Sequence, residues 1–136
     1  MITGLGMDLI EIDRIRRVLE GKSADRFLER VLAPEEREAA RGKQGRLAEY
    51  VAGRFAAKEA VVKALGCGIG ELAGFQDVII ASAPNGKPVC RLSEASAAKL
   101  GLPSGLRIHI TITHTAAVAA ATAVAERPDE GGTRDG

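Results

Sequence analysis

A helix without a polar face is the feature that most constrains how this chain can fold. Residues 46–65 are rich in alanine and leucine, and Gly66 follows them as a left-handed helix end. Helical spacing gives one apolar stripe and one row of alanines: Leu47, Val51, Phe55, Val62 and Leu65, and Ala48, Ala52, Ala56, Ala60 and Ala64. The alanine row lets a neighbouring backbone come close. From residue 55 onward no face is wholly polar, so some charge must be held beside packed surface.

Glu59 and Lys63 are the charged pair of this helix that bears most on function. They lie four residues apart with the acid first, so their side chains meet on one face. One interpretation is a helix salt bridge, which contributes about 0.2–0.5 kcal/mol. The other is a carboxylate kept ionised beside apolar surface by a cation such as Mg²⁺ or a lysine. The glycine-rich run 66–70 after the helix favours the second interpretation.

Asp8 is a second acid in an apolar setting. Residues 2–10 alternate as a strand, with Leu5, Met7 and Leu9 on one face and Gly4, Gly6 and Asp8 on the other. The strand predicts either a residue that caps the next turn or a metal ligand on a rigid element. Glycines on either side of the acid leave room for another group to approach.

The chain length and charge limit the classes of protein that need be considered. A chain of 136 residues suits one domain, and we assign 1–126 to it and 127–136 to a disordered tail. The net charge of +1 gives no general reason to bind nucleic acid or a membrane. The opening residues do not form a signal peptide and Cys67 and Cys90 form no metal motif, which favours a reduced, cytoplasmic location.

Basic residues gather near the first predicted helix. Asp13 is expected to cap a helix over 14–19, whose exposed surface carries Arg14, Arg16 and Arg17. Arg26 continues the positive surface. This surface is either simply solvated or docks an acidic partner. After it, Pro34 and the acids at 35 and 36 are typical of a helix N-terminus.

The last third of the chain predicts short strands. Residues 76–81 and 89–92 form a hairpin around Asn85-Gly86, whose turn holds Lys87 where it can reach a phosphate. Residues 106–113 alternate as a strand that ends at His114. Residues 116–125 remain open between a helix, which their alanines prefer, and an antiparallel strand.

Four motifs in this order resemble the bacterial holo-acyl-carrier-protein synthases, the small class of 4′-phosphopantetheinyl transferases. They are residues 4–12 (GLGMDLIEI) with Arg14-Ile15, residues 54–60 (RFAAKEA) with Lys63-Ala64, residues 85–88 (NGKP), and residues 111–114 (TITH). The resemblance covers roughly residues 1–126. It implies an α+β fold in which an antiparallel sheet packs against a long central helix, and a homotrimer with active sites at subunit interfaces.

The resemblance also implies a reaction and the residues that perform it. The reaction is Mg²⁺-dependent transfer of 4′-phosphopantetheine from coenzyme A to a serine of apo-acyl carrier protein, with release of adenosine 3′,5′-bisphosphate, in fatty acid biosynthesis. Asp8 and Glu59 resemble the family's Mg²⁺ ligands, and Lys63 its cation on the transferring phosphate. The remaining roles are coenzyme A contacts at Arg54, Asn85, Gly86, Lys87, Pro88 and His114, and carrier-protein contacts at Arg14, Arg17 and Arg26.

Two departures and two alternatives accompany this resemblance. Cys67 stands where the family often has a small hydroxyl residue, and Thr111 where serine is common. We hypothesise that Glu59 also helps to remove the serine proton. A coenzyme A binding module without catalysis would not interact with a carrier protein, and a structural trimer would be indifferent to removal of Mg²⁺.

Overall fold

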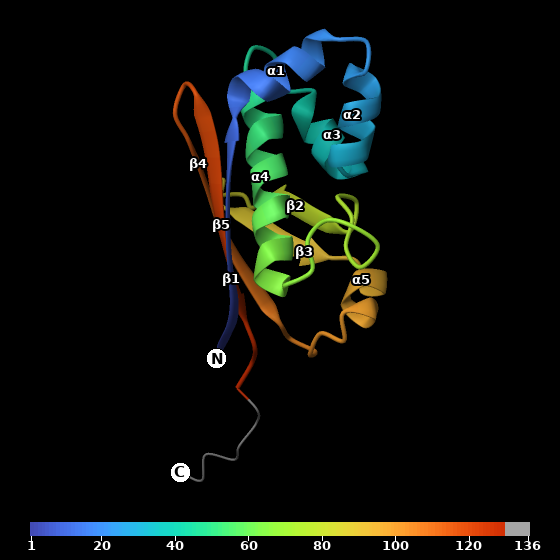
Figure 1. Ribbon diagram of the computed structural model, residues 1–136. Coiled ribbons are helices and arrows are strands. Elements are labelled where there is room, and N and C mark those ends of the chain that lie inside the picture. Colours follow the sequence, from blue (N-terminus) through green and yellow to red (C-terminus); the bar gives the residue numbers. More distant parts are fainter. Residues whose placement is uncertain (130–136) are drawn as a thin grey trace.

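The computed structural model describes residues 1–129 and has the expected α+β architecture (Figure 1). The elements follow one another as β1 (Ile2–Glu11), α1 (Ile12–Glu20), α2 (Ala24–Val31), α3 (Pro34–Ala40), α4 (Leu47–Leu65), β2 (Val78–Ser82), β3 (Pro88–Leu92), α5 (Glu94–Lys99), β4 (Arg107–His114) and β5 (Val118–Glu126). Helix α4 lies along one face of the main sheet, and α1, α2 and α3 gather around its N-terminal half.

The main sheet is antiparallel with the strand order β1-β5-β4. The segment whose structure the sequence left open is therefore the central strand, because β5 pairs with β1 on one side and β4 on the other. Ala119, Ala121, Ala123 and Ala125 are buried on one face of β5. Their small side chains let α4 pack closely, so tertiary packing overrides the helix preference of alanine.

Helix α4 contacts β1 through backbone rather than side chains. A Cβ added at Gly6 would lie 1.8 Å from the carbonyl oxygen of Ala60, and one at Gly4 would lie 1.8 Å from that of Ala64. Only glycine fits at such a separation. Gly66 ends the helix with a φ of +81°, as the sequence predicts. The glycine face of β1 therefore turns toward α4, and its apolar side chains lie on the opposite face.

That opposite face of β1 is exposed and apolar. Leu5, Met7 and Leu9 expose 68%, 63% and 64% of their surface. Apolar side chains on a sheet of a globular protein normally face a core, so three neighbouring exposed ones indicate a surface that another molecule covers.

Helix α1 begins earlier than the sequence predicts. The expected cap, Asp13, lies inside the first turn and pairs with Arg16. The helix starts at Ile12 because the chain enters it directly from β1, with Ile12 fully buried and its N–H bonded to the carbonyl of Ala117. The prediction of a cap at Asp13 is therefore wrong, and burial of Ile12 is the physical reason.

The second sheet is the predicted hairpin of β2 and β3. Its turn carries Asn85 and Gly86, and Gly86 has a φ of +84°. Residues 130–136, most of the predicted disordered tail, lie outside the described residues. Before them, Arg127 still exchanges backbone hydrogen bonds with Met1. Within residues 1–129 no helix has both the length and the apolar character to cross a membrane.

Candidate active site

Asp8 reaches the surface of α4 where β1 and the helix are closest. Its Oδ1 lies 3.2 Å from the Nζ of Lys63, which also donates to the carbonyl oxygen of Met7 at 3.0 Å. This ion pair joins two residues 55 positions apart in the sequence. The glycines at 4 and 6 make it possible, because a bulkier strand would stand further from the helix.

Glu59 lies one turn before Lys63 and is only partly exposed. Loss of hydration raises the pKa of Glu59, the nearby Asp8 carboxylate raises it further, and Lys63 acts in the opposite direction. Asp8 and Glu59 are therefore close enough to repel each other. Two carboxylates and one ammonium leave the cluster with a formal charge of −1 when all three are ionised.

Asp8 and Glu59 also line one groove of about 420 Å³. Its other walls are mostly apolar and include Ile15, Phe27 and Phe55 from α1, α2 and α4. Arg14 from α1 lies on the rim. The groove is therefore lined by two carboxylates and by apolar side chains, and it borders the basic surface of α1.

The two carboxylates suit a hard divalent cation. Magnesium binds through one or two protein carboxylates and completes its coordination with water and substrate phosphates. Within residues 1–129 no third histidine, cysteine or acid joins Asp8 and Glu59 to make a protein cage. The donor set matches a metal that is shared with a phosphate substrate rather than one that is fully enclosed by protein.

Two of the predicted nucleotide contacts, Arg54 and His114, line a different hollow, of about 210 Å³. The guanidinium of Arg54 stacks 4.6 Å from the centre of the Tyr50 ring and donates to Ser82 Oγ at 3.0 Å. Ser82 ends β2, directly before the turn that carries Asn85, Gly86, Lys87 and Pro88. Asp8, Glu59 and Lys63 thus form one cluster and Arg54 and His114 a second, basic one, and a hydrogen bond from Arg54 links the second cluster to the strand before the turn.

The predicted docking arginines lie on the outside of the helical end. Arg14, Arg17 and Arg26 are all exposed. Arg16 differs because it pairs with Asp13 and lies 3.4 Å from Glu49 of α4. Arg16 is therefore paired with acids of the same chain, in contrast to Arg14 and Arg17 on the same helix.

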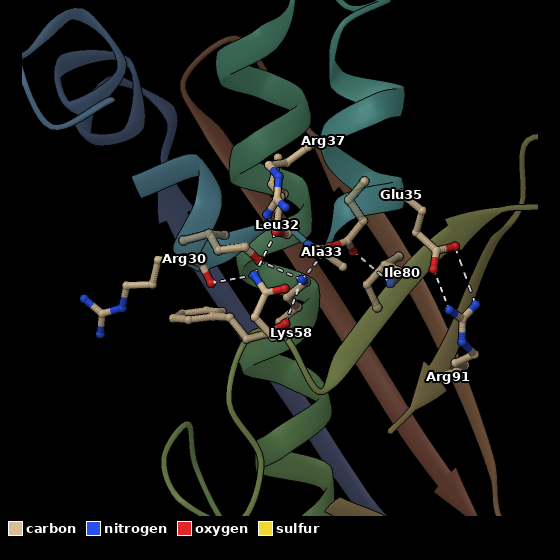
Figure 2. A network of polar contacts seen from close by, with 12 residues as sticks. Arg30, Leu32, Ala33, Glu35, Arg37, Lys58, Ile80 and Arg91 are labelled. Atoms are coloured by element: carbon tan, nitrogen blue, oxygen red, sulfur yellow. Dashed lines mark hydrogen bonds and ion pairs between the residues drawn. The ribbon is translucent and has the colours of Figure 1, made fainter. Parts of the chain in front are cut away.

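A second ion pair of α4 lies inside the protein and was not predicted from the sequence (Figure 2). The ammonium of Lys58 has three acceptors: Glu36 Oε1 at 2.5 Å, the carbonyl of Val31 at 2.7 Å and that of Phe75 at 2.8 Å. Glu36 also accepts from the backbone N–H groups of Ala33 at 2.6 Å and Ile80 at 2.8 Å. The absence of a polar face on α4 was the only signal, and it did not identify the lysine or its partner.

Comparison with known proteins places this chain in a family. The family model described as the 4′-phosphopantetheinyl transferase superfamily matches residues 4–121. This chain belongs to that superfamily, which confirms both the recognition from the four motifs and the predicted class of enzyme.

Individual relatives within this superfamily are holo-[acyl-carrier-protein] synthases. The holo-[acyl-carrier-protein] synthase of Bacillus thuringiensis is 42% identical over 93% of this chain and 97% of its own. A crystal structure of that synthase from Neisseria meningitidis has a TM-score of 0.83 at 34% identity and covers 93% of this chain and 100% of its own. One from Bacillus anthracis, in complex with CoA (3′,5′-ADP), has a TM-score of 0.78 at 41% identity, with coverage of 93% and 97%.

Proposed function

We propose that this protein transfers the 4′-phosphopantetheine group from coenzyme A to a serine of an apo-acyl carrier protein and thereby supports fatty acid biosynthesis. The proposal rests above all on the meeting of Asp8, Glu59 and Lys63, of which the two carboxylates line one groove. The names of the relatives and the coenzyme A bound to one of them support the choice of substrates.

The reaction is a phosphoryl transfer whose atoms balance as follows. The serine Oγ forms a bond to the phosphorus that carries pantetheine, and the bond from that phosphorus to the bridging oxygen of the pyrophosphate breaks. Adenosine 3′,5′-bisphosphate leaves with the electron pair. The serine proton passes to a base, and Glu59 is our candidate because its carboxylate lines the groove that the serine would enter.

Asp8 and Glu59 are the residues that would hold Mg²⁺. When bound, the ion supplies positive charge to the pyrophosphate oxygens as negative charge develops on them. Lys63 contributes a second positive charge from the same side and is tied to β1 through the Met7 carbonyl, which limits where its ammonium can move. This chain therefore orients the phosphate with two elements, a strand and a helix.

The nucleotide end of coenzyme A is assigned to the basic cluster. Arg54, Lys87 with its turn, and His114 supply positive charge and hydrogen-bond donors for phosphate groups. In a homotrimer, the acidic cluster of one subunit and the basic cluster of the next would together hold one coenzyme A. The exposed apolar face of β1, with Leu5, Met7 and Leu9, supports such an assembly because it needs a cover.

The carrier protein is assigned to the surface of α1 and α2. Arg14, Arg17 and Arg26 would attract an acidic partner, and the apolar walls of the groove beside Arg14 would accept apolar side chains of that partner. The serine would then enter the groove beside the two carboxylates. We place this reaction in the cytoplasm.

One experiment tests the proposed function. The purified protein is incubated with apo-acyl carrier protein, coenzyme A and Mg²⁺, and the carrier protein is weighed by intact mass spectrometry. The expected result is a gain of one phosphopantetheine group, which disappears when a chelator removes the metal. A carrier protein of unchanged mass at high enzyme concentration would refute the proposal, and transfer that withstands chelation would refute its metal step.

A further inference from the structure

The β2–β3 hairpin depends on neighbouring elements for its position. Within residues 1–129 its sheet has only two strands, and such a hairpin is marginally stable by itself. Strand β2 pairs with β3 along one edge, while the N–H of Ile80 on β2 donates to Glu36 Oε2 of α3. A carboxylate of α3 therefore takes a place that a further strand would otherwise occupy.

The position of this hairpin decides the position of the turn at its end. Ser82 and Pro88 are the last paired residues of the two strands, so the turn between them moves with the hairpin. This turn holds the segment 85–88 that the proposed function assigns to coenzyme A. A shift of the hairpin relative to α4 would therefore move these contacts out of line with the coenzyme A that the proposed assembly holds.

Lys58 holds the segment that leads into the hairpin. It directly precedes Glu59 on α4 and donates to the carbonyl of Phe75, which lies in the segment that leads into β2. The ring of Phe75 lies 5.2 Å from that of Phe55, a wall of the acidic groove. Through Lys58, the same turn of α4 that presents Glu59 is bound to the hairpin and to the wall of the groove.

We propose that Lys58 and Glu36 are positioning residues that hold the coenzyme A turn at 85–88 in a fixed place relative to the rest of its own chain, so that in the proposed assembly it meets the acidic groove of the neighbouring subunit. The inference rests on the proposed function and adds to it a pair of residues that touch neither substrate. All three N–H groups of Lys58 and both oxygens of Glu36 are used within the protein. Because both side chains are buried and every N–H group of Lys58 is used, the pair is closed to a ligand and acts through the elements it joins.

The test compares variants that remove this connection with a variant that only loosens the core. Lys58→Met keeps an unbranched side chain that is one atom shorter, but leaves the Glu36 carboxylate buried without its cation. Lys58→Met with Glu36→Gln removes both charges, so this double variant is expected to fold better. Val51→Ala, at a fully buried position of α4 outside the network, serves as the control for lowered stability.

Each variant is assayed well below its own melting temperature for kcat, for KM of coenzyme A, and for KM of the carrier protein. Binding of adenosine 3′,5′-bisphosphate is measured by calorimetry as a readout independent of turnover. We expect the double variant to raise KM for coenzyme A, and to weaken nucleotide binding, by about tenfold or more, because displacement of about 1 Å can cost up to about a hundredfold. The control and the KM for the carrier protein are expected to stay near wild type.

Three results would overturn the inference. The first is a double variant with wild-type KM and nucleotide binding, which would make the pair a matter of stability alone. The second is an equal rise of KM in the Val51→Ala control. The third is failure of both network variants to fold, which would make the pair a requirement of the fold. Failure of the wild-type protein to modify any carrier protein would instead refute the proposed function.

Discussion

Two lysines of α4 each pair with a carboxylate of another element, and the two pairs differ in burial and in net charge. Lys58 and Glu36 have side-chain exposures of 0% and 1% and lie 2.5 Å apart. Lys63 and Asp8 have exposures of 50% and 18% and lie 3.2 Å apart. The inner pair is neutral as a whole, whereas the outer pair shares its space with Glu59, which adds a second negative charge.

The difference shows what separates a pair that is compensated within the protein from one that is not. Burial of the inner charges is tolerated because every donor and acceptor is satisfied, and such a pair has no capacity for a ligand. The outer cluster keeps an excess carboxylate near solvent, at the edge of a groove. A cation that bound there would relieve the repulsion between the two carboxylates. The outer cluster could therefore bind a cation because one of its negative charges has no partner within the cluster.

The largest effect is expected when the outer cluster loses a carboxylate. Glu59→Gln or Asp8→Asn keeps the size of the side chain but removes a charge needed to hold Mg²⁺, and transfer should fall by on the order of a thousandfold, because metal stabilisation of developing charge is worth several kcal/mol. The rate of modification of the carrier protein, followed by mass, measures it. Glu94→Gln, an exposed acid on α5, is the control. A normal rate in either site variant would remove that residue from the site.

Breaking the inner pair is expected to affect stability most. Glu36→Ala leaves the Lys58 ammonium buried and uncompensated, and the free energy of unfolding should fall by about 3–5 kcal/mol. Denaturant unfolding measures this change. The neighbouring Glu35 pairs with Arg91 at 2.5 Å on the surface, and Glu35→Ala should cost about 0–1 kcal/mol. Similar losses for both variants would contradict the assignment of the inner pair as buried and satisfied.

Lys63→Ala should have an intermediate effect, on turnover. Removal of its positive charge is expected to lower kcat by about ten- to a hundredfold while the affinity for coenzyme A changes less, because the basic cluster around Arg54 holds the nucleotide. Steady-state kinetics and nucleotide binding separate the two effects. Lys99→Ala is the control, since Lys99 also ends on a backbone carbonyl at the surface. A defect confined to binding would contradict the role given to Lys63.

Part of the outer cluster could be predicted from the sequence because the spacing of Glu59 and Lys63 is local, whereas Asp8, 55 residues before Lys63, was joined to them by the resemblance to a family. Glu59 and Lys63 lie one helical turn apart. Glycines on the same face of β1 as Asp8 indicate that another group approaches the strand closely. The inner pair could not be predicted in this way. Glu36 lies 22 residues before Lys58, and its place after Pro34 already explained it as an acid near a helix N-terminus.

Tertiary contacts decided the other points that the sequence left open or predicted wrongly. The alanines of β5 are compatible with a helix, and only the space left by α4 makes them a central strand. Asp13 has the right chemistry for a cap, but burial of Ile12 moves the helix start before it. The periodicity of the sequence also could not predict that Arg54 and His114 line a different hollow from Asp8 and Glu59. Sequence spacing does not say which hollow a residue lines.

The smallest expected effect concerns the stability of the metal-free protein. The folded state raises the pKa of Glu59, so it binds the proton of that carboxyl more tightly than the unfolded chain does. Its contribution to stability is therefore greatest at low pH and is lost as pH rises from the ordinary value of glutamic acid through the raised one. At neutral pH without metal, Glu59→Gln should melt slightly higher than wild type although it is inactive. Mg²⁺ should then raise the melting temperature of the wild type and leave the variant unchanged, since only a ligand that binds the folded state stabilises it. A variant that melts lower than wild type without metal, or that is stabilised equally by Mg²⁺, would show that the carboxylate is already compensated within the protein, as Glu36 is.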